Sequence, residues 1–87
     1  MMNKDGETMQ FAVHAPKADR VCLVLENEIG ATTWLPMQPD GAGSWRVIHR
    51  LAGGYRVQYF TAEGGTWLNC GSFGLRARRL QEMASAG

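Results

Sequence analysis

The sequence has 87 residues, of which 45% are hydrophobic, and its formal net charge is +1. This length supports one domain with one hydrophobic core and is too short for a catalytic barrel. The near-neutral charge gives no indication of nucleic-acid or membrane-surface binding. The first six residues are polar with no apolar run behind them, so we expect neither a secretory signal nor a membrane span, and a cytoplasmic protein.

Glycines and prolines recur about every ten residues, which is typical of short strands joined by turns. The first predicted strand, 8–15, alternates apolar and polar residues, and Pro16 ends it. The second, 20–26, is apolar on both faces, as in a central strand that is covered on both sides. A shorter strand follows at 32–37.

Residues 38–44 contain one proline and two glycines and predict a tight reversal. Three further strands then follow from the alternation and from two glycine-rich turns, at 45–51, 55–61 and 66–69. On the strand at 45–51, Trp45 falls on the mostly apolar face, and we therefore expect it in the core.

The last segment supports two interpretations. Residues 73–81 read as a closing strand to about Leu80 with Phe73, Leu75 and Ala77 inward, whereas 75–83 also contain good helix formers. We favour the strand because a sandwich needs its open edge covered. The expected organisation is a flexible tail at 1–7, one domain at 8–80 and a flexible tail at 81–87.

Together these elements predict an all-β fold, an immunoglobulin-like antiparallel β-sandwich of about seven strands. No metal or cofactor site is expected, because the two cysteines, Cys22 and Cys70, lie far apart and lack metal-ligand spacing. In a reducing compartment both thiols should be free and serve as small packing residues, although the sequence does not exclude a disulfide. No catalytic pair stands out, so we do not expect an enzyme.

An ordered set of short motifs resembles a known family. The stretch 11–25 (FAVHAPKADRVCLVL), then Leu35-Pro36-Met37, Gly43-Ser44-Trp45 and Gly53-Gly54-Tyr55 with Val57-Gln58-Tyr59-Phe60 follow one another in the order and spacing of the isoamylase N-terminal domain. The match spans roughly residues 9–70. The resemblance implies an early-set β-sandwich related to the glycogen-binding modules of carbohydrate-binding module family 48, which hold an α-glucan or pack against a catalytic barrel.

A glucan site needs flat aromatic surfaces for the C–H faces of sugars and amide or charged groups for the hydroxyls. Trp34 and Trp67 fall near the positions where glycan-binding relatives carry aromatic residues, and Gln58 stands where the family places a sugar-contacting lysine. Asn69, two residues after Trp67, is a further candidate. The alternative is that the two tryptophans cover the sandwich edge or an interface.

Two functions follow as hypotheses. The first is a non-catalytic carbohydrate-binding module that recognises an α-1,4-linked glucan through Trp34, Gln58, Trp67 and Asn69. The second is an interaction domain of the same fold that docks on a glycan-active enzyme or another protein, through the same aromatic residues or through the arginines at 76–79. Those arginines also fit a charged edge that prevents aggregation. Neither nucleic acid nor membrane is an expected partner.

Overall fold

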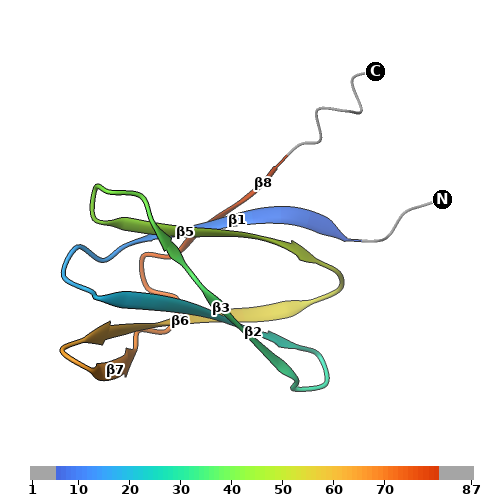
Figure 1. The fold of residues 1–87 in the computed structure, drawn as a ribbon. Helices are drawn as coiled ribbons and strands as arrows, with labels where there is room; N and C mark the ends of the chain where they lie inside the picture. The colour runs from blue at the N-terminus through green and yellow to red at the C-terminus, as the bar shows by residue number, and fades with distance from the viewer. Residues whose placement is uncertain (1–5, 81–87) are drawn as a thin grey trace.

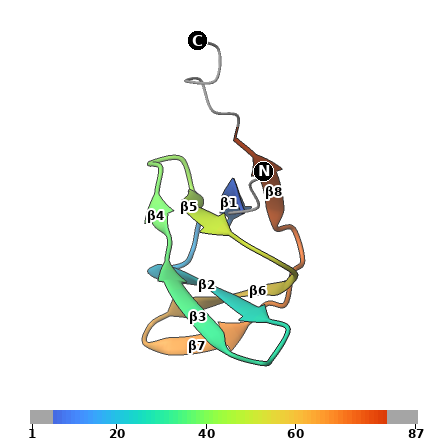
Figure 2. The same ribbon diagram turned by 90° about the vertical axis from the view of Figure 1, so that its right-hand side faces the viewer.

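The computed structural model describes residues 6–80, and within this range it contains strands and turns only. Two four-stranded antiparallel sheets face each other, as the two layers in Figures 1 and 2 show. The predicted all-β sandwich is therefore confirmed. Within residues 6–80 there is no helix that could span a membrane.

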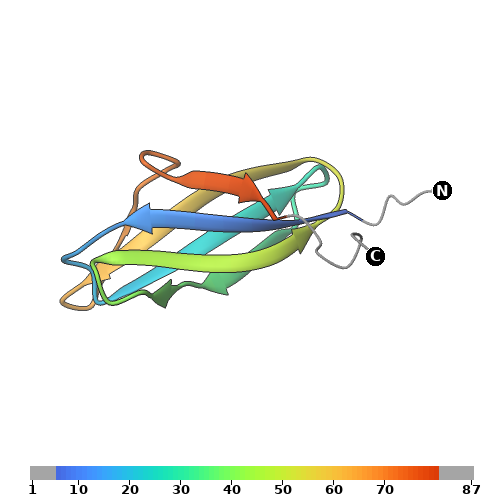
Figure 3. The ribbon, with the colours of Figure 1, turned by 90° about the horizontal axis from the view of Figure 1, so that it is seen from above.

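One sheet has the strand order β4-β5-β1-β8. Its strands are β4 (Gln38–Pro39), β5 (Ser44–Leu51), β1 (Glu7–His14) and β8 (Arg76–Arg79). The other sheet has the order β3-β2-β6-β7. Its strands are β3 (Thr32–Pro36), β2 (Arg20–Asn27), β6 (Tyr55–Glu63) and β7 (Thr66–Asn69). Figure 3 shows the strands of the two sheets crossing obliquely, as the natural twist of sheets requires.

The core lies between the sheets and consists of the inward residues of the central strands. Phe11 on β1 and Leu23 on β2 are almost completely buried, because strand alternation directs them toward the opposite sheet. Trp45 packs against this core, and its Nε1–H donates a hydrogen bond to the carbonyl of Ala15 at an N···O distance of 3.1 Å. The predicted inward face of β5 is thus confirmed.

The hairpin between β6 and β7 shows how the sequence sets a turn. Gly64 and Gly65 both adopt positive φ, at 59° and 86°, between the paired residues Glu63 and Thr66. A two-residue loop of this kind matches the right-handed twist of the flanking strands and strongly favours glycine. The register of β7 against β6 follows from this turn.

The third predicted strand, 32–37, ends one residue early. Met37 is buried and its N–H donates to the carbonyl of Val21, while the next two residues pair with β5 in the other sheet. Residues 32–39 therefore cross from one sheet to the other. The short strand β4, which the sequence did not predict, raises the number of strands to eight.

The closing strand is confirmed as β8, but it starts only at Arg76. The prediction that Phe73, Leu75 and Ala77 all point inward is wrong for Phe73. Phe73 is 85% exposed in a turn over residues 71–74, whereas Leu75 packs against the core. Ala77 is paired with the inward residue Phe11 and so shares its face, although its place on the edge strand leaves it exposed. The Tyr59 hydroxyl fixes this turn by donating to the carbonyl of Phe73 at 2.7 Å.

The predicted domain limits are partly outside the described residues. β1 begins at Glu7, a position that the sequence analysis assigned to the N-terminal tail. Residues 1–5 and 81–87 lie outside the described range, so the expected tails remain predictions. At one corner of the sandwich, Arg79 of β8 forms an ion pair with Glu7 of β1 at an N···O distance of 3.3 Å.

Candidate functional site

The four residues predicted to bind glucan lie on one surface, the outer face of the sheet β3-β2-β6-β7. Trp34 on β3 is paired with Val24 on β2, and Val24 is paired on its other side with Gln58 on β6. Residues that are directly opposite each other in a sheet share a face. Trp34 and Gln58 therefore lie in one row, two strand spacings or roughly 10 Å apart.

Trp67 and Asn69 of β7 join the same face through their partners on β6. Trp67 is paired with Ala62 and Asn69 with Phe60. Because residues 58, 60 and 62 alternate along one strand, their side chains and those of their partners project on the same side. The structure thus places all four predicted residues on one face, although Trp34 and Trp67 lie on opposite edge strands and Trp67 is about 13 Å along the strands from the row of Gln58.

A pair of aromatic rings forms the centre of this surface. The ring centroids of Trp34 and Phe60 are 5.2 Å apart with an interplanar angle of 33°. Since β2 lies between β3 and β6, the two rings must meet above β2, and Val24 beneath them is only 1% exposed although it points outward. Trp34 nevertheless remains 55% exposed, so much of its side chain faces solvent.

Phe60 is a residue that sequence reasoning missed as part of the site. Its alternation with Gln58 along β6 was visible in the sequence and placed both on the outer face. What the sequence did not show is the strand order, which sets β3 and β6 on either side of β2 and so allows Phe60 to reach Trp34.

The polar residues of the surface are held in place by hydrogen bonds. The Asn69 side chain donates from Nδ2 to Oε1 of Gln58 at 3.3 Å and accepts at Oδ1 from the N–H of Gly71 at 2.7 Å. Both polar atoms of the Asn69 amide are thus engaged. Within residues 6–80, the amide nitrogen of Gln58 forms no hydrogen bond, so its two N–H donors remain available.

Trp67 stands at the other end of the surface beside a separate hollow. Its side chain is 47% exposed and lines an apolar pocket of about 270 Å³. The pocket is lined by Arg20, Val21, Cys22, Pro36, Met37, Trp45 and Trp67. Arg20 is paired with Ala62 on the side opposite Trp67, so a guanidinium group and an indole flank the same buried alanine.

We use the term aromatic surface for Trp34, Gln58, Phe60, Trp67 and Asn69.

The two cysteines are both free and half-buried. Burial raises the pKa of the Cys22 thiol, an effect that its contact with the backbone of Leu35 only partly offsets. Cys22 therefore stays a neutral thiol at physiological pH and behaves as a packing residue on the outer face of β2. Within residues 6–80, no group of three or more histidine, cysteine or acidic side chains is arranged to hold a metal ion.

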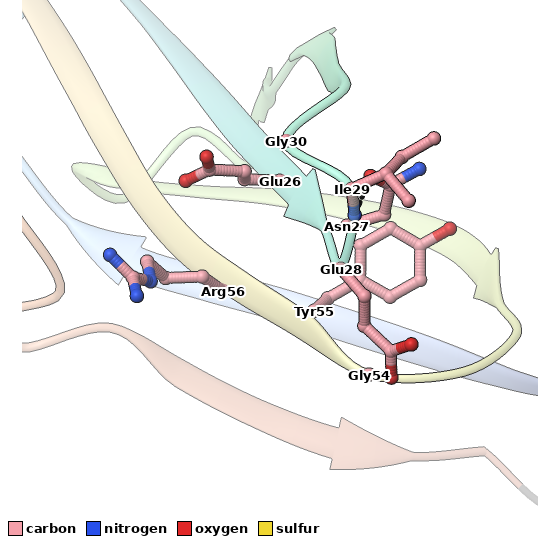
Figure 4. A pocket seen from close by; sticks show the side chains of 8 residues that line it. All are labelled: Glu26, Asn27, Glu28, Ile29, Gly30, Gly54, Tyr55 and Arg56. Carbon is pink, nitrogen blue, oxygen red and sulfur yellow. Dashed lines mark hydrogen bonds between the residues drawn. The ribbon is translucent and has the colours of Figure 1, made fainter.

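A larger pocket of about 510 Å³ lies at one end of the sandwich, between the β2–β3 turn and the start of β6 (Figure 4). Its lining carries both charge signs, from Glu26, Glu28 and Arg56, around the ring of Tyr55. Glu28 lies against Gly54, where a β-carbon would stand 3.0 Å from its carboxylate oxygen. Asn27 stabilises the turn by accepting hydrogen bonds from two backbone N–H groups. The pocket is therefore a consequence of the turn's geometry.

Comparison with known proteins gives a match in fold. No protein family matches the sequence, and no curated protein does. Two solved structures of the catalytic module of SpuA, a multi-modular glycogen-degrading virulence factor of pneumococcus, one of them with a bound inhibitor, superpose with a TM-score of 0.66 at 17% identity. The match covers 77% of this chain and 11% of the SpuA chain. This chain thus shares its fold with a small part of a module from a glycogen-degrading enzyme.

Proposed function

We propose that this chain is a non-catalytic carbohydrate-binding module that holds an α-1,4-linked glucan on the aromatic surface. The observation that supports the proposal most is the placement of all four predicted residues on one exposed face, with Phe60 added to them. The fold match to part of a glycogen-degrading module and the sequence resemblance to isoamylase N-terminal domains agree with it.

The chemistry of the aromatic surface suits binding. The tilted rings of Trp34 and Phe60 offer a flat apolar area on which a sugar ring can stack through its C–H groups. The amide of Gln58, oriented by Asn69, lies two strand spacings away and can donate to a hydroxyl of the same ligand. Indole and amide groups do not titrate near neutral pH, so these residues provide contacts and no acid or base.

Affinity electrophoresis in native gels containing glycogen tests the proposal. We expect the protein to be retarded, and we expect Trp34→Ala or Trp67→Ala to weaken binding about tenfold or more, because each removes a stacking surface. Phe73→Ala is the matched control, since Phe73 is an exposed aromatic residue outside the aromatic surface, and it should leave retardation unchanged. A protein that migrates without retardation at every glycogen concentration would refute the proposal.

Docking of another protein on the aromatic surface is the second candidate. The half-exposed indoles of Trp34 and Trp67 favour it, because exposed aromatic side chains are typical of interface centres. Under this alternative, glycogen does not retard the protein, and a pull-down with glycan-active enzymes recovers a partner that Trp34→Ala no longer binds. The glycogen gel therefore separates the two candidates.

A further inference from the structure

The outer face of the other sheet, β4-β5-β1-β8, carries a cluster of arginines that glucan binding does not use. On β1, Ala12 is paired with Arg46 of β5 on one side and with Arg76 of β8 on the other. Gln10 lies in the next row on this face, paired with Ile48 and Arg78. This face is the one toward the viewer in Figure 3, where β8, β1 and β5 lie side by side.

Arg50 completes the cluster, because it is paired with Thr8 in the row beyond Gln10. We use the term arginine face for Arg46, Ile48, Arg50, Arg76 and Arg78. Arginines stand on both sides of β1, roughly 10 Å apart across the sheet and about 7 Å apart between alternate residues of a strand. Between them, Ala12 of β1 has a small side chain, and a hollow of about 360 Å³ lies along Gln10, Ala12 and the β8 arginines.

The positive charge of this face is largely uncompensated within residues 6–80. The acidic residues of that range are Glu7, Asp19, Glu26, Glu28, Asp40 and Glu63. None of them projects from the outer face of these four strands. Glu7 pairs with Arg79, whose side chain belongs to the opposite face of β8. Asp40 is close enough to Arg46 to feel its charge, although backbone N–H groups are the main reason that its pKa is lowered.

The residues of the arginine face indicate what kind of partner it can bind. Guanidinium groups bind carboxylates in a bidentate, planar geometry, and several of them on a flat sheet favour a ligand with repeated negative charges. Ile48, which is 55% exposed, sits among the arginines and offers an apolar contact that a protein partner can use. No phenylalanine, tyrosine or tryptophan of residues 6–80 projects from this face to stack on a nucleobase, and the His14 imidazole at its end is hydrogen-bonded to the Ser44 hydroxyl, which argues against single-stranded nucleic acid.

We propose that the arginine face docks an acidic segment of a partner protein, with carboxylates paired to Arg50, Arg76 and Arg78 around an apolar contact at Ile48. The arginine face and the aromatic surface are the two opposite outer faces of the sandwich. A ligand on one face does not obstruct the other. The domain can therefore hold a glucan and a protein at the same time.

Fluorescence anisotropy with a short labelled peptide in which glutamate alternates with leucine and serine tests this proposal. We expect binding that weakens as ionic strength rises, because the charges are exposed. Arg50→Glu and Arg78→Glu should each weaken it about tenfold or more, since each replaces an attraction by a repulsion. Arg56→Glu, the same change on the outer face of the opposite sheet, is the matched control and should leave affinity within about twofold.

Several results would overturn the proposal. They are no binding of the acidic peptide at low ionic strength, an equal loss in Arg56→Glu, or tighter binding of labelled oligo(dT) or heparin than of the peptide. The last result would assign the face to a nucleic acid or a sulfated polymer. Circular dichroism melts check that each variant is folded. Glycogen retardation of Arg78→Glu should match the unchanged protein, so failure of docking and failure of glucan binding are distinguishable.

Discussion

The two sheets share one core but differ on their outer faces. On the aromatic surface, the outward residues Val24 and Ala62 are buried, because large rings lie over or beside them. On the arginine face, the outward residue Ile48 is more than half exposed, since the arginines around it project into water. The comparison teaches that an outward side chain in a small sandwich gains burial only where its neighbours lie flat against the sheet.

Truncation of a core side chain should give the largest loss of stability, and the loss should be equal for the two sheets because their inner faces contribute to the same core. We expect Phe11→Ala on β1 and Leu23→Ala on β2 each to lower the free energy of unfolding by about 3 kcal/mol, through lost burial and a residual cavity. Urea denaturation followed by tryptophan fluorescence measures both. A loss below about 1 kcal/mol for either variant would mean that one sheet contributes little to the core.

Intermediate effects should separate the two outer faces. Val24→Ala removes two methyl groups from beneath Trp34 and Phe60, and we expect it to cost about 1.5 kcal/mol. Ile48→Ala, on the arginine face, should change stability by no more than about 0.5 kcal/mol, because the side chain is already in contact with water. Thermal melts of the two variants measure both losses of stability. Equal losses would contradict the difference in burial between Val24 and Ile48.

A smaller loss of stability than that of Val24→Ala is expected at the link between the two sheets. Tyr59→Phe removes the hydrogen bond that holds the turn at 71–74, where the chain passes from β7 to β8, and should cost about 1 kcal/mol. The measurement is the midpoint of chemical denaturation at neutral pH. An unchanged midpoint would show that Leu75 and the strand pairing of β8 hold this segment without the hydroxyl.

The same residue predicts a pH dependence. Burial, and next the neighbouring Cys70 thiol, raise the pKa of Tyr59 above its ordinary value of 10.0. The neutral phenol therefore stabilises the fold at all lower pH values, and this stabilisation is lost as pH rises through the folded-state pKa. We expect the decline in stability above about pH 10 to be less steep in Tyr59→Phe than in the unchanged protein. Identical alkaline profiles would contradict this expectation.

Much of the fold could be predicted from the sequence, because alternation and glycine turns are local signals. They located the six strands from β1 to β7 other than β4, within one or two residues. β4 was missed because it has two exposed residues and exists only where the chain changes sheets. Phe73 was misplaced because its turn depends on Tyr59, a residue fourteen positions earlier.

The sequence predicted most residues of the candidate site, but not how they are arranged relative to one another. Alternation placed Gln58 outward, and the family resemblance singled out Trp34 and Trp67. The contact between Trp34 and Phe60 could not be predicted, because it depends on which strands flank β2. The sequence indicated the arginines at 76–79 as a charged edge but not that they share a face with Arg46 and Arg50, because Arg46 and Arg76 are thirty positions apart in sequence and lie on either side of β1.

The ion pair between Glu7 and Arg79 has a practical consequence for protein engineering. Since β1 and β8 are antiparallel neighbours, the entry and exit points of residues 7–79 lie side by side at one corner. Such a unit can be grafted into a surface loop of a host protein without stretching the host backbone, and its strands suit circular permutation. A host protein carrying this insert would leave both broad faces of the sandwich, the aromatic surface and the arginine face, open to solvent.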